Sequence, residues 1–399
     1  MNLYCKKVYR DNPNIKWSRY SIIYHILIDR FAGFKSVKNW DKPSFIGGNI
    51  RGIINKLDYL KNLGINTIWI SPFYNTTMYH GYHITDYFDV DPKFGNIDDI
   101  KELIYDAHNL ELKIIADFVP NHCSIKHPYF IDAITNKDSD YKNWFYFNKW
   151  PKDYMSFLSV KEIPKLNLDN KETGDYIIKA AKFWLKSGFD GYRIDHVIGL
   201  SNKYLNTFSN EIKKTYPKAI LIGEAWMRGI QFRELNTIKI PNKIFKWFNN
   251  SSSDGIFKNY IGVLDGVLDF RFNKIIKSFI IYKNFPLKRY KNLLYKHYKK
   301  YPECFLLPTF LDNHDMNRFL FECDNDKKKL MKAAEYQFRT HQPLIIYYGT
   351  EVGLSQNKSV WDSNYHGDIQ ARMPMKWINQ DEKLLNFYKK LIKNRITDY

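Results

Sequence analysis

Eight short apolar runs recur along this chain, and stretches of helix length separate most of them. The runs predict strands at Ile22–Ile28, Asn66–Ile70, Leu112–Phe118, Phe189–Ile194, Ala219–Gly223, Gly266–Phe270, Phe305–Phe310 and Leu344–Tyr348. The clearest amphipathic patterns predict helices at Ile53–Leu63, Ile97–Leu110, Asp175–Lys186 and Glu382–Ile396. Strands that alternate with helices favour a parallel sheet, and eight such units would close a (β/α)8 TIM barrel.

The chain has 399 residues, whereas such a barrel typically needs about 250. The longest interval without a clear pattern runs from residue 123 to 173 and contains the aromatic segment NWFYFNKW. A structureless loop of that length is uncommon inside a compact domain. We therefore expect a catalytic barrel formed by residues 1–122 and 174–399, with a small subdomain at 123–173 inserted after the third strand.

The formal net charge is +19 and the sequence pI is about 9.4. A basic chain can bind nucleic acid, but the lysines here are scattered in short groups such as Lys213-Lys214 and Lys327-Lys328-Lys329. This pattern favours a solvated lysine-rich surface, so we expect no nucleic-acid partner.

The four cysteines are widely spaced and form no C-x-x-C pair. We expect buried free thiols and no zinc site. The N-terminus lacks the apolar stretch and cleavage site of a secretory signal, and no apolar run reaches the ~18 residues that suggest a transmembrane helix. These observations predict a cytoplasmic protein with no membrane partner.

Four segments lie at the ends of predicted strands and contain charged or hydrogen-bonding residues. They are DFVPNH at 117–122, GYRIDH at 191–196, GEAW at 223–226 and DNHD at 312–315. A barrel strand delivers catalytic groups to the open end of a barrel in this way. Cleavage of a glycosidic bond requires two carboxyl groups on either side of it, and these segments offer Asp195, Glu224 and Asp315.

In this order the four segments resemble the motifs of glycoside hydrolase family 13, the alpha-amylase family. The resemblance also covers YHGYHITDYFDVDPKFG at 79–95 and ARMPMKW at 371–377, so it runs from about residue 20 to the end. It implies an α-glucan or maltooligosaccharide substrate and chemistry that requires no cofactor. The segment IPKLN at 163–167 is similar to the neopullulanase and cyclomaltodextrinase version, and a compact intracellular alpha-amylase is the alternative subgroup.

The resemblance assigns the nucleophile to Asp195 and the general acid/base to Glu224. Arg193 lies two residues before Asp195, so on a strand both side chains point to the same face, where the guanidinium would keep Asp195 ionised. Glu224 follows an apolar run, and poor solvation there would favour the protonated form that a general acid requires. The alternative for Arg193 and Asp195 is a structural ion pair that lines the barrel.

The resemblance implies further sugar-binding residues, each with a structural alternative. Asp315, His314 and His122 would bind hydroxyls of the sugar in the cleavage subsite, and Tyr82 would stack beneath it; structural histidines and a core tyrosine are the alternatives. Asp368 and Arg372 would bind the next sugar on the non-reducing side, or form a surface i,i+4 ion pair. The two candidates on the leaving side of the bond are Trp226 and His196.

Asn121 corresponds to a calcium ligand of many alpha-amylases, but relatives without calcium keep the same residue, so a metal site stays undecided. Most members of the family carry a β-sandwich domain after the barrel. The predicted last helix reaches residue 396, so we expect no C-terminal β-sandwich domain.

The main hypothesis is a retaining glycoside hydrolase that cleaves α-1,4-glucosidic bonds of maltooligosaccharides or storage α-glucan. A 4-α-glucanotransferase would use the same residues and the same covalent intermediate. A non-catalytic carbohydrate-binding relative is disfavoured because all three acids are present. The sequence does not indicate an oligomeric state.

Overall fold

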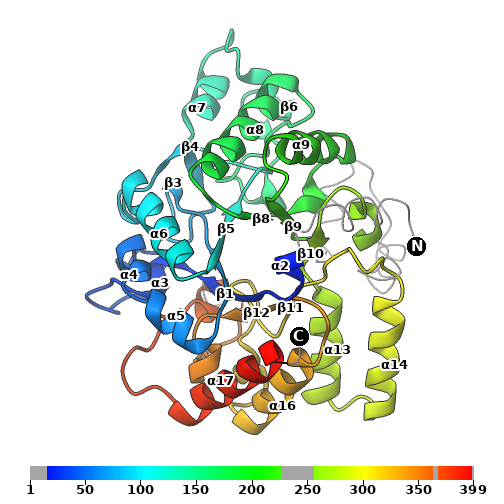
Figure 1. The fold of residues 1–399 in the computed structure, drawn as a ribbon. Helices are drawn as coiled ribbons and strands as arrows, with labels where there is room; N and C mark the ends of the chain where they lie inside the picture. Colours follow the sequence, from blue (N-terminus) through cyan, green and yellow to red (C-terminus); the bar gives the residue numbers. More distant parts are fainter. Residues whose placement is uncertain (1–15, 227–255, 363–366, 398–399) are drawn as a thin grey trace. The chain divides into compact units, whose positions relative to one another are not determined.

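The computed structural model describes residues 16–226, 256–362 and 367–397 (Figure 1). The chain divides into two compact units. The first comprises Met1–Ser71, Lys93–Ile115 and Leu268–Tyr399, and the second comprises Pro72–Pro92 and Ala116–Val267. Every predicted site residue lies in the described part of the chain.

Hydrogen bonding joins eight strands into one sheet in the order β10-β9-β8-β5-β2-β1-β12-β11. Their bounds are β1 Ile22–Ile26, β2 Thr67–Ile70, β5 Lys113–Phe118, β8 Gly191–Ile194, β9 Ile220–Gly223, β10 Gly266–Val267, β11 Thr309–Phe310 and β12 Leu344–Tyr347. In the first unit β1 lies parallel to both β2 and β12, and in the second unit β9 lies parallel to both β8 and β10. Each of the eight predicted runs contains one of these strands, so the prediction of a parallel β/α sheet is confirmed.

Several predicted bounds differ from those in the structure. The first strand stops at Ile26 because the short helix α3 (Ile28–Phe31) follows it. The sixth strand stops at Val267, because Asp269 caps helix α13 (Phe270–Ile280) by accepting a hydrogen bond from the backbone of Phe272 at 2.8 Å. The seventh strand is shorter than predicted and comprises only Thr309–Phe310. The helix predicted at Ile53–Leu63 is divided into α4 (Ile50–Ile54) and α5 (Leu57–Leu63). It ends at Leu63 as predicted, and the next residue, Gly64, caps it with a left-handed φ of 96°.

Helices flank the strands in both units (Figure 1). Among the described residues, the remaining α-helices of the first unit are α2 Lys16–Arg19, α6 Ile97–Asn109, α14 Leu287–Tyr298, α15 Phe319–Glu322, α16 Lys327–Phe338 and α17 Glu382–Thr397. The described α-helices of the second unit are α7 Pro128–Thr135, α8 Lys171–Lys186 and α9 Asn202–Thr215. Helix α8 begins four residues earlier than predicted, because the side chain of Asn170 accepts a hydrogen bond from the backbone of Thr173 at 3.0 Å and caps the helix.

The strands consist largely of apolar residues because both faces are covered. All residues of β1, β2, β8, β9 and β12 are buried, which is typical of parallel strands in α/β proteins. The second unit also contains an antiparallel hairpin of β3 (Tyr74–Thr76) and β4 (Ile84–Val90), which is not among the predicted elements. A further short hairpin, β6 (Phe147–Lys149) with β7 (Asp153–Tyr154), lies in the 123–173 segment.

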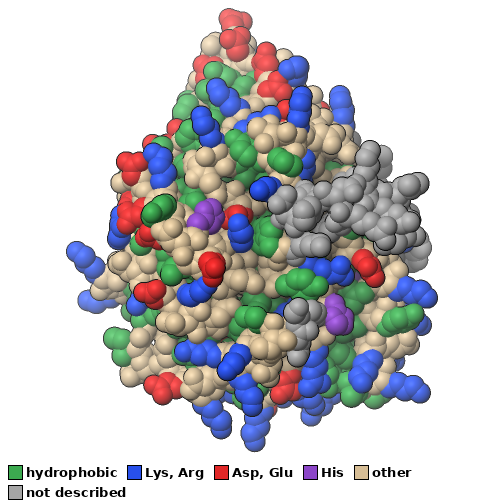
Figure 2. Space-filling view, in the orientation of Figure 1, with side chains coloured by type: hydrophobic (Ala, Val, Ile, Leu, Met, Phe, Trp, Pro, Cys, Tyr) green, Lys and Arg blue, Asp and Glu red, His purple; other side chains and the backbone are tan. Residues whose placement is uncertain are grey.

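The surface charge, the cysteines and the hydropathy of the helices can each be compared with what the sequence predicts. Lysine and arginine side chains are spread over the face drawn in Figure 2, with acidic residues among them. Cys123 and Cys323 are free and buried, as expected, but Cys304 is disulfide-bonded, so the expectation of free thiols is wrong there. None of the helices in the described ranges is long and apolar enough to cross a membrane.

Candidate active site

One arginine of the second unit contacts three carboxyl groups. Arg193 lies on β8, and its Nη1 is 2.8 Å from an oxygen of Asp117 at the end of β5 and 2.8 Å from Oδ1 of Asp195. Its Nη2 is 2.6 Å from Oε1 of Glu224, the residue directly after β9. All four side chains are nearly inaccessible to solvent, with exposed fractions between 0% and 9%.

The strands explain this convergence. Arg193 and Asp195 are two residues apart along an extended segment, so their side chains share one face, and the predicted contact is present. β5, β8 and β9 are neighbours in the sheet. Because parallel strands end at the same edge, Asp117 and Glu224 reach the guanidinium from either side.

The surroundings of Glu224 differ from the expected apolar environment. The side chain is buried, but its Oε1 faces the guanidinium of Arg193 and its Oε2 accepts a hydrogen bond from the backbone N–H of His196 at 3.2 Å. The apolar environment was expected from the residues that precede Glu224 along the chain. Those residues carry no information about the cation on the neighbouring strand.

The charge state of Arg193 follows from these neighbours. Burial lowers the pKa of the guanidinium, but the nearby Asp117, Glu224 and Asp195 raise it, and the net pKa lies well above the usual value. Arg193 therefore stays positive at every pH at which the protein is folded.

Tyr82 belongs to the same group of side chains. Its hydroxyl donates a hydrogen bond to Oδ2 of Asp117 at 2.8 Å and lies 3.4 Å from Nη1 of Arg193. Asp117 opens the DFVPNH segment, but it is absent from the predicted site residues. The signal that could have identified it is its place at the end of a predicted strand, which Asp195 and Glu224 share.

His122 and His196 flank one aromatic ring in the second unit. The ring of Phe157 lies 4.8 Å from His122 and 4.6 Å from His196, measured between centroids. Burial, with nearby positive charge, lowers the pKa of His196 to about 3. Burial, together with the neighbouring histidines, also holds the pKa of His122 well below its usual range. Both rings are therefore neutral near pH 7 and can donate or accept hydrogen bonds as uncharged imidazoles. Phe157 lies in the irregular 123–173 segment, and no motif or periodicity marks it in the sequence.

A second group of predicted residues gathers in the first unit. Asp315 lies 2.9 Å from Nη2 of Arg372 and 3.0 Å from Nε2 of His314. The Nε of Arg372 also donates to the backbone oxygen of His314 at 2.9 Å, and Asp368 forms an ion pair with the same guanidinium. Arg372 is buried, whereas the side chains of Asp315 and Asp368 are 26% and 46% exposed.

Two further predicted residues, Trp226 and Asn121, belong to neither the group around Arg193 nor the group around Arg372. Trp226 is partly exposed after β9. Asn121 is buried; its Nδ2 lies 3.3 Å from Nδ1 of His122, and its Oδ1 accepts no hydrogen bond. Such an oxygen suits a hard cation such as calcium, but across residues 16–226, 256–362 and 367–397 no three His, Cys, Asp or Glu side chains cluster as a metal site.

Comparison with known proteins gives concordant matches. The family model described as "Alpha amylase, catalytic domain" matches residues 25–384. Alpha-amylase 2 of Dictyoglomus thermophilum is 40% identical over 384 residues, which cover 95% of this chain and 63% of that protein. The chain therefore spans less than two thirds of that relative's length.

Solved structures agree with the sequence matches. A cyclomaltodextrinase superposes with a TM-score of 0.81 at 28% identity, covering 96% of this chain and 64% of the other. An alpha-amylase from Geobacillus thermoleovorans complexed with acarbose superposes with a TM-score of 0.78 at 28% identity, covering 95% and 79%. The chain has the TIM-barrel catalytic fold and belongs to the alpha-amylase family of glycoside hydrolases, family 13.

Proposed function

We propose that this chain is a retaining glycoside hydrolase that cleaves α-1,4-glucosidic bonds of maltooligosaccharides or storage α-glucan. The observation that carries the proposal is the pair of carboxyl groups, Asp195 and Glu224, at the ends of adjacent strands and in contact with one guanidinium. A retaining glycosidase requires two carboxyl groups about 5–5.5 Å apart. The names of the related alpha-amylase and cyclomaltodextrinase support the substrate class.

Asp195 is the nucleophile in this proposal. Its carboxylate attacks the anomeric carbon while Glu224 donates a proton to the leaving oxygen, so that one C–O bond forms as the other breaks. The chain then carries a glycosyl ester on Asp195. Glu224, now ionised, takes a proton from water, and the water oxygen displaces Asp195 with net retention.

The charge around Arg193 is compatible with a proton on one of the three carboxyl groups. One guanidinium faces three carboxyl groups, so a proton on one of them reduces the repulsion among like charges. Asp117 already accepts hydrogen bonds from Arg193 and Tyr82, which suits an ionised group. We assign the proton to Glu224, where the reaction uses it.

The remaining residues are proposed to bind the substrate. Asp315 is the third carboxylate and, with His122 and His314, binds hydroxyls of the sugar whose bond is cleaved. Tyr82 stacks beneath that sugar. The other proposed sugar-binding residues are Arg193, His196, Trp226, Asp368 and Arg372.

We propose that residues 123–173 form the inserted subdomain. Two isolated β-bridges support this. The bridge between His122 and Lys165 joins the start of the segment to its C-terminal part, and the bridge between Phe145 and Leu166 joins its middle to that same part.

Incubation with maltoheptaose tests the function. The unaltered chain should release shorter sugars that are initially α-anomers, and Asp195→Asn should release none. Asp324→Asn is the matched control, because Asp324 is 91% exposed, and it should behave like the unaltered chain. Initial β-anomers would contradict retention, and turnover by Asp195→Asn would show that the nucleophile is assigned wrongly.

The same incubation separates hydrolysis from transfer. A 4-α-glucanotransferase would resolve the glycosyl ester with a sugar hydroxyl and produce oligosaccharides longer than maltoheptaose. Parallel reactions with β-cyclodextrin and pullulan show whether the chain opens cyclic glucans or accepts a linear glucan that contains α-1,6 linkages.

A further inference from the structure

A cavity of about 420 Å³ in the first unit has no role in the proposed reaction. It is lined by α14, by the end of α16, and by residues 339–342, which lead into the amino end of β12. Asp315, in contrast, follows the carboxyl end of β11. In a β/α barrel, catalytic groups lie at the carboxyl ends of strands, so the cavity is separate from the candidate active site.

Tyrosines form the inner wall of this cavity. Tyr290 is only 3% exposed, and Phe279 supports its ring at a centroid distance of 4.6 Å. The ring of Tyr336 lies 5.1 Å from that of Tyr290 at an interplanar angle of 63°. The buried hydroxyl of Tyr290 has no hydrogen-bond partner among the described residues. An unpartnered buried hydroxyl is costly, and it marks a place where a ligand atom can bind.

The rim of the cavity is positive. Lys291 and Arg339 both line it, and no described aspartate or glutamate does. Within the part of the chain that the structure describes, neither side chain forms an ion pair, and the guanidinium of Arg339 lies 5.8 Å from the centroid of the Tyr336 ring. Two cations without carboxylate partners favour the binding of an anion.

A buried arginine reinforces this charge. The carbonyl groups at the end of α16 and in the 339–342 segment that follows it carry partial negative charge. Arg395 binds three of them, donating to the backbone oxygens of Phe338, Thr340 and Gln342 at 2.7, 2.7 and 2.6 Å. It therefore offsets the helix end and places a further positive charge behind the 339–342 segment.

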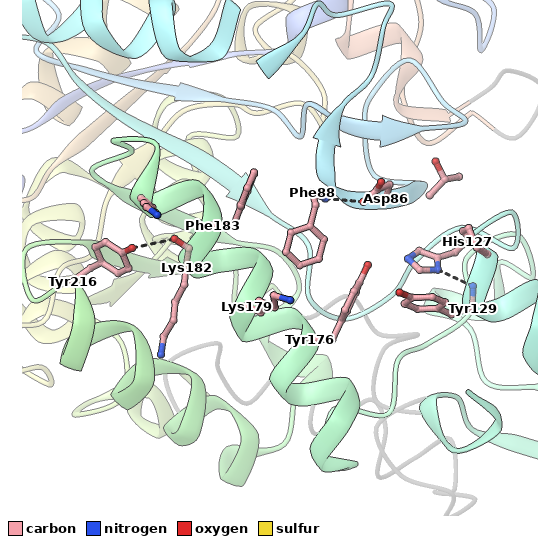
Figure 3. Close-up of a pocket in the computed structure, with 12 residues that line it drawn as sticks. Asp86, Phe88, His127, Tyr129, Tyr176, Lys179, Lys182, Phe183 and Tyr216 are labelled. Atoms are coloured by element: carbon pink, nitrogen blue, oxygen red, sulfur yellow. Dashed lines mark hydrogen bonds between the residues drawn. The ribbon is translucent and has the colours of Figure 1, made fainter. Parts of the chain in front are cut away.

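A second cavity, in the other unit, provides a comparison for the balance of charge. It has a volume of about 800 Å³ and also combines aromatic rings with lysines of α8, as Figure 3 shows for Phe88, Tyr176 and Lys179. There, however, Lys182 is paired with Glu211 at 2.7 Å and Asp86 lines the wall. That cavity has less unbalanced positive charge and provides matched control positions.

We propose that the cavity at the amino end of β12 binds a small phosphate monoester carried on a ring, either a sugar phosphate or a nucleoside monophosphate. Arg339 and Lys291 bind the phosphate, the tyrosine rings contact the flat face of the ring, and the hydroxyl of Tyr290 binds a polar atom of the ring. The volume lies within the ~300–1,000 Å³ range of small-molecule sites.

Calorimetric titration tests the proposal on the complete chain at constant ionic strength, since a protein of net charge +19 also binds anions without specificity. The probes are glucose 6-phosphate, AMP, inorganic phosphate and glucose. Glucose 6-phosphate or AMP should bind at least tenfold more tightly than inorganic phosphate, and glucose should not bind at this site. Tighter binding of glucose 6-phosphate would identify the ligand as a sugar phosphate, and tighter binding of AMP would identify it as a nucleoside monophosphate.

Variants locate the site. The double variant Arg339→Gln/Lys291→Gln should weaken ester binding at least tenfold. The control double variant Lys179→Gln/Lys186→Gln removes the same charge from the other cavity, and it should change the affinity for the ester less than twofold. Tyr290→Phe should weaken the ester several-fold and leave inorganic phosphate unchanged. Equal losses in both double variants, equal affinity for ester and phosphate, or no ester binding at millimolar concentration would each overturn the proposal. These results do not depend on glucan hydrolysis, so the proposed function can fail independently.

Discussion

Arg193 and Glu224 form an ion pair of 2.6 Å that is set by the register of two strands. Arg193 on β8 is paired with Ile222 on β9, two residues before Glu224. The side chains of Ile222 and Glu224 therefore point to the same side as that of Arg193. A shift of one residue in this pairing would turn Glu224 away from the guanidinium, so the contact depends on the sheet as a whole.

Replacement of Arg193 by Met should destabilise the fold by about 3–5 kcal/mol, because buried Asp117, Asp195 and Glu224 lose their common cation. Without the guanidinium, the folded carboxyl groups retain protons at a pH where the unfolded ones have lost them. Stability of the variant should therefore decrease as pH rises above about 4. Urea unfolding at pH 5 and pH 8 checks this, and an equal loss at both pH values would contradict it.

Glu224→Gln and Asp195→Asn should respond differently to the leaving group. With maltoheptaose, Glu224→Gln should reduce kcat by about 10²–10⁴-fold, since the leaving oxygen is no longer protonated. An aryl maltoside with an acidic phenol needs no such proton, so the variant should recover most of the rate of glycosyl ester formation. Asp195→Asn should be inactive on both substrates. Burst kinetics provide the measurement, and equal defects of Glu224→Gln on both substrates would reject the acid role.

The eight strands of the main sheet could be located from local patterns, because each lies in an apolar run that needs no information from the rest of the chain. The contact of Arg193 with Asp195 is also local, since a spacing of two residues on a strand is enough to predict it. Asp117 could not be placed in the same way. It is 76 positions from Arg193 in the sequence, and only the order of β5, β8 and β9 in the sheet brings the two together.

Other differences between the sequence predictions and the structure also have specific physical causes. Asp269 ends the sixth strand early, because a side-chain cap competes with an apolar run that is typical of an extended segment. Phe157, which contacts two predicted histidines, lies in a segment with neither helical nor strand periodicity. The disulfide of Cys304 could not be predicted from spacing, since cysteine pairing depends on the tertiary fold.

The acidic residues bound to Arg372 should separate into two kinetic classes. Asp315→Asn keeps an oxygen for the contact with Arg372 but removes the charge proposed to act on the sugar, so kcat should fall by about 10²-fold. Asp368 is more exposed, and Asp368→Asn should raise KM several-fold with little change in kcat, as expected for uniform substrate binding. Steady-state kinetics with maltoheptaose measure both, and a large kcat defect in Asp368→Asn alone would reverse the assignment.

His127 should make stability depend on pH in mildly acidic solution. Burial lowers the pKa of this histidine from 6.5 to about 4 in the folded chain. The unfolded chain therefore binds one more proton than the folded chain between these values. The stability that the neutral ring provides is complete above pH 6.5, and it is lost progressively as the pH falls towards 4.

His127→Asn tests this titration without removing the helix cap. His127 caps α7 by accepting a hydrogen bond from the backbone of Tyr129 at 3.3 Å, and asparagine is a favourable residue at that position. At pH 8 the variant should be less stable by about 1–2 kcal/mol, because the smaller side chain loses ring contacts. Between pH 6.5 and 4 the unfolding free energy of both proteins should fall as the pH decreases. The slope for the unaltered chain should be steeper than that for the variant by about 1.4 kcal/mol per pH unit. Urea unfolding across this range measures both slopes. Parallel curves would show that His127 binds its proton equally in the folded and unfolded chain, and that burial does not keep the ring neutral.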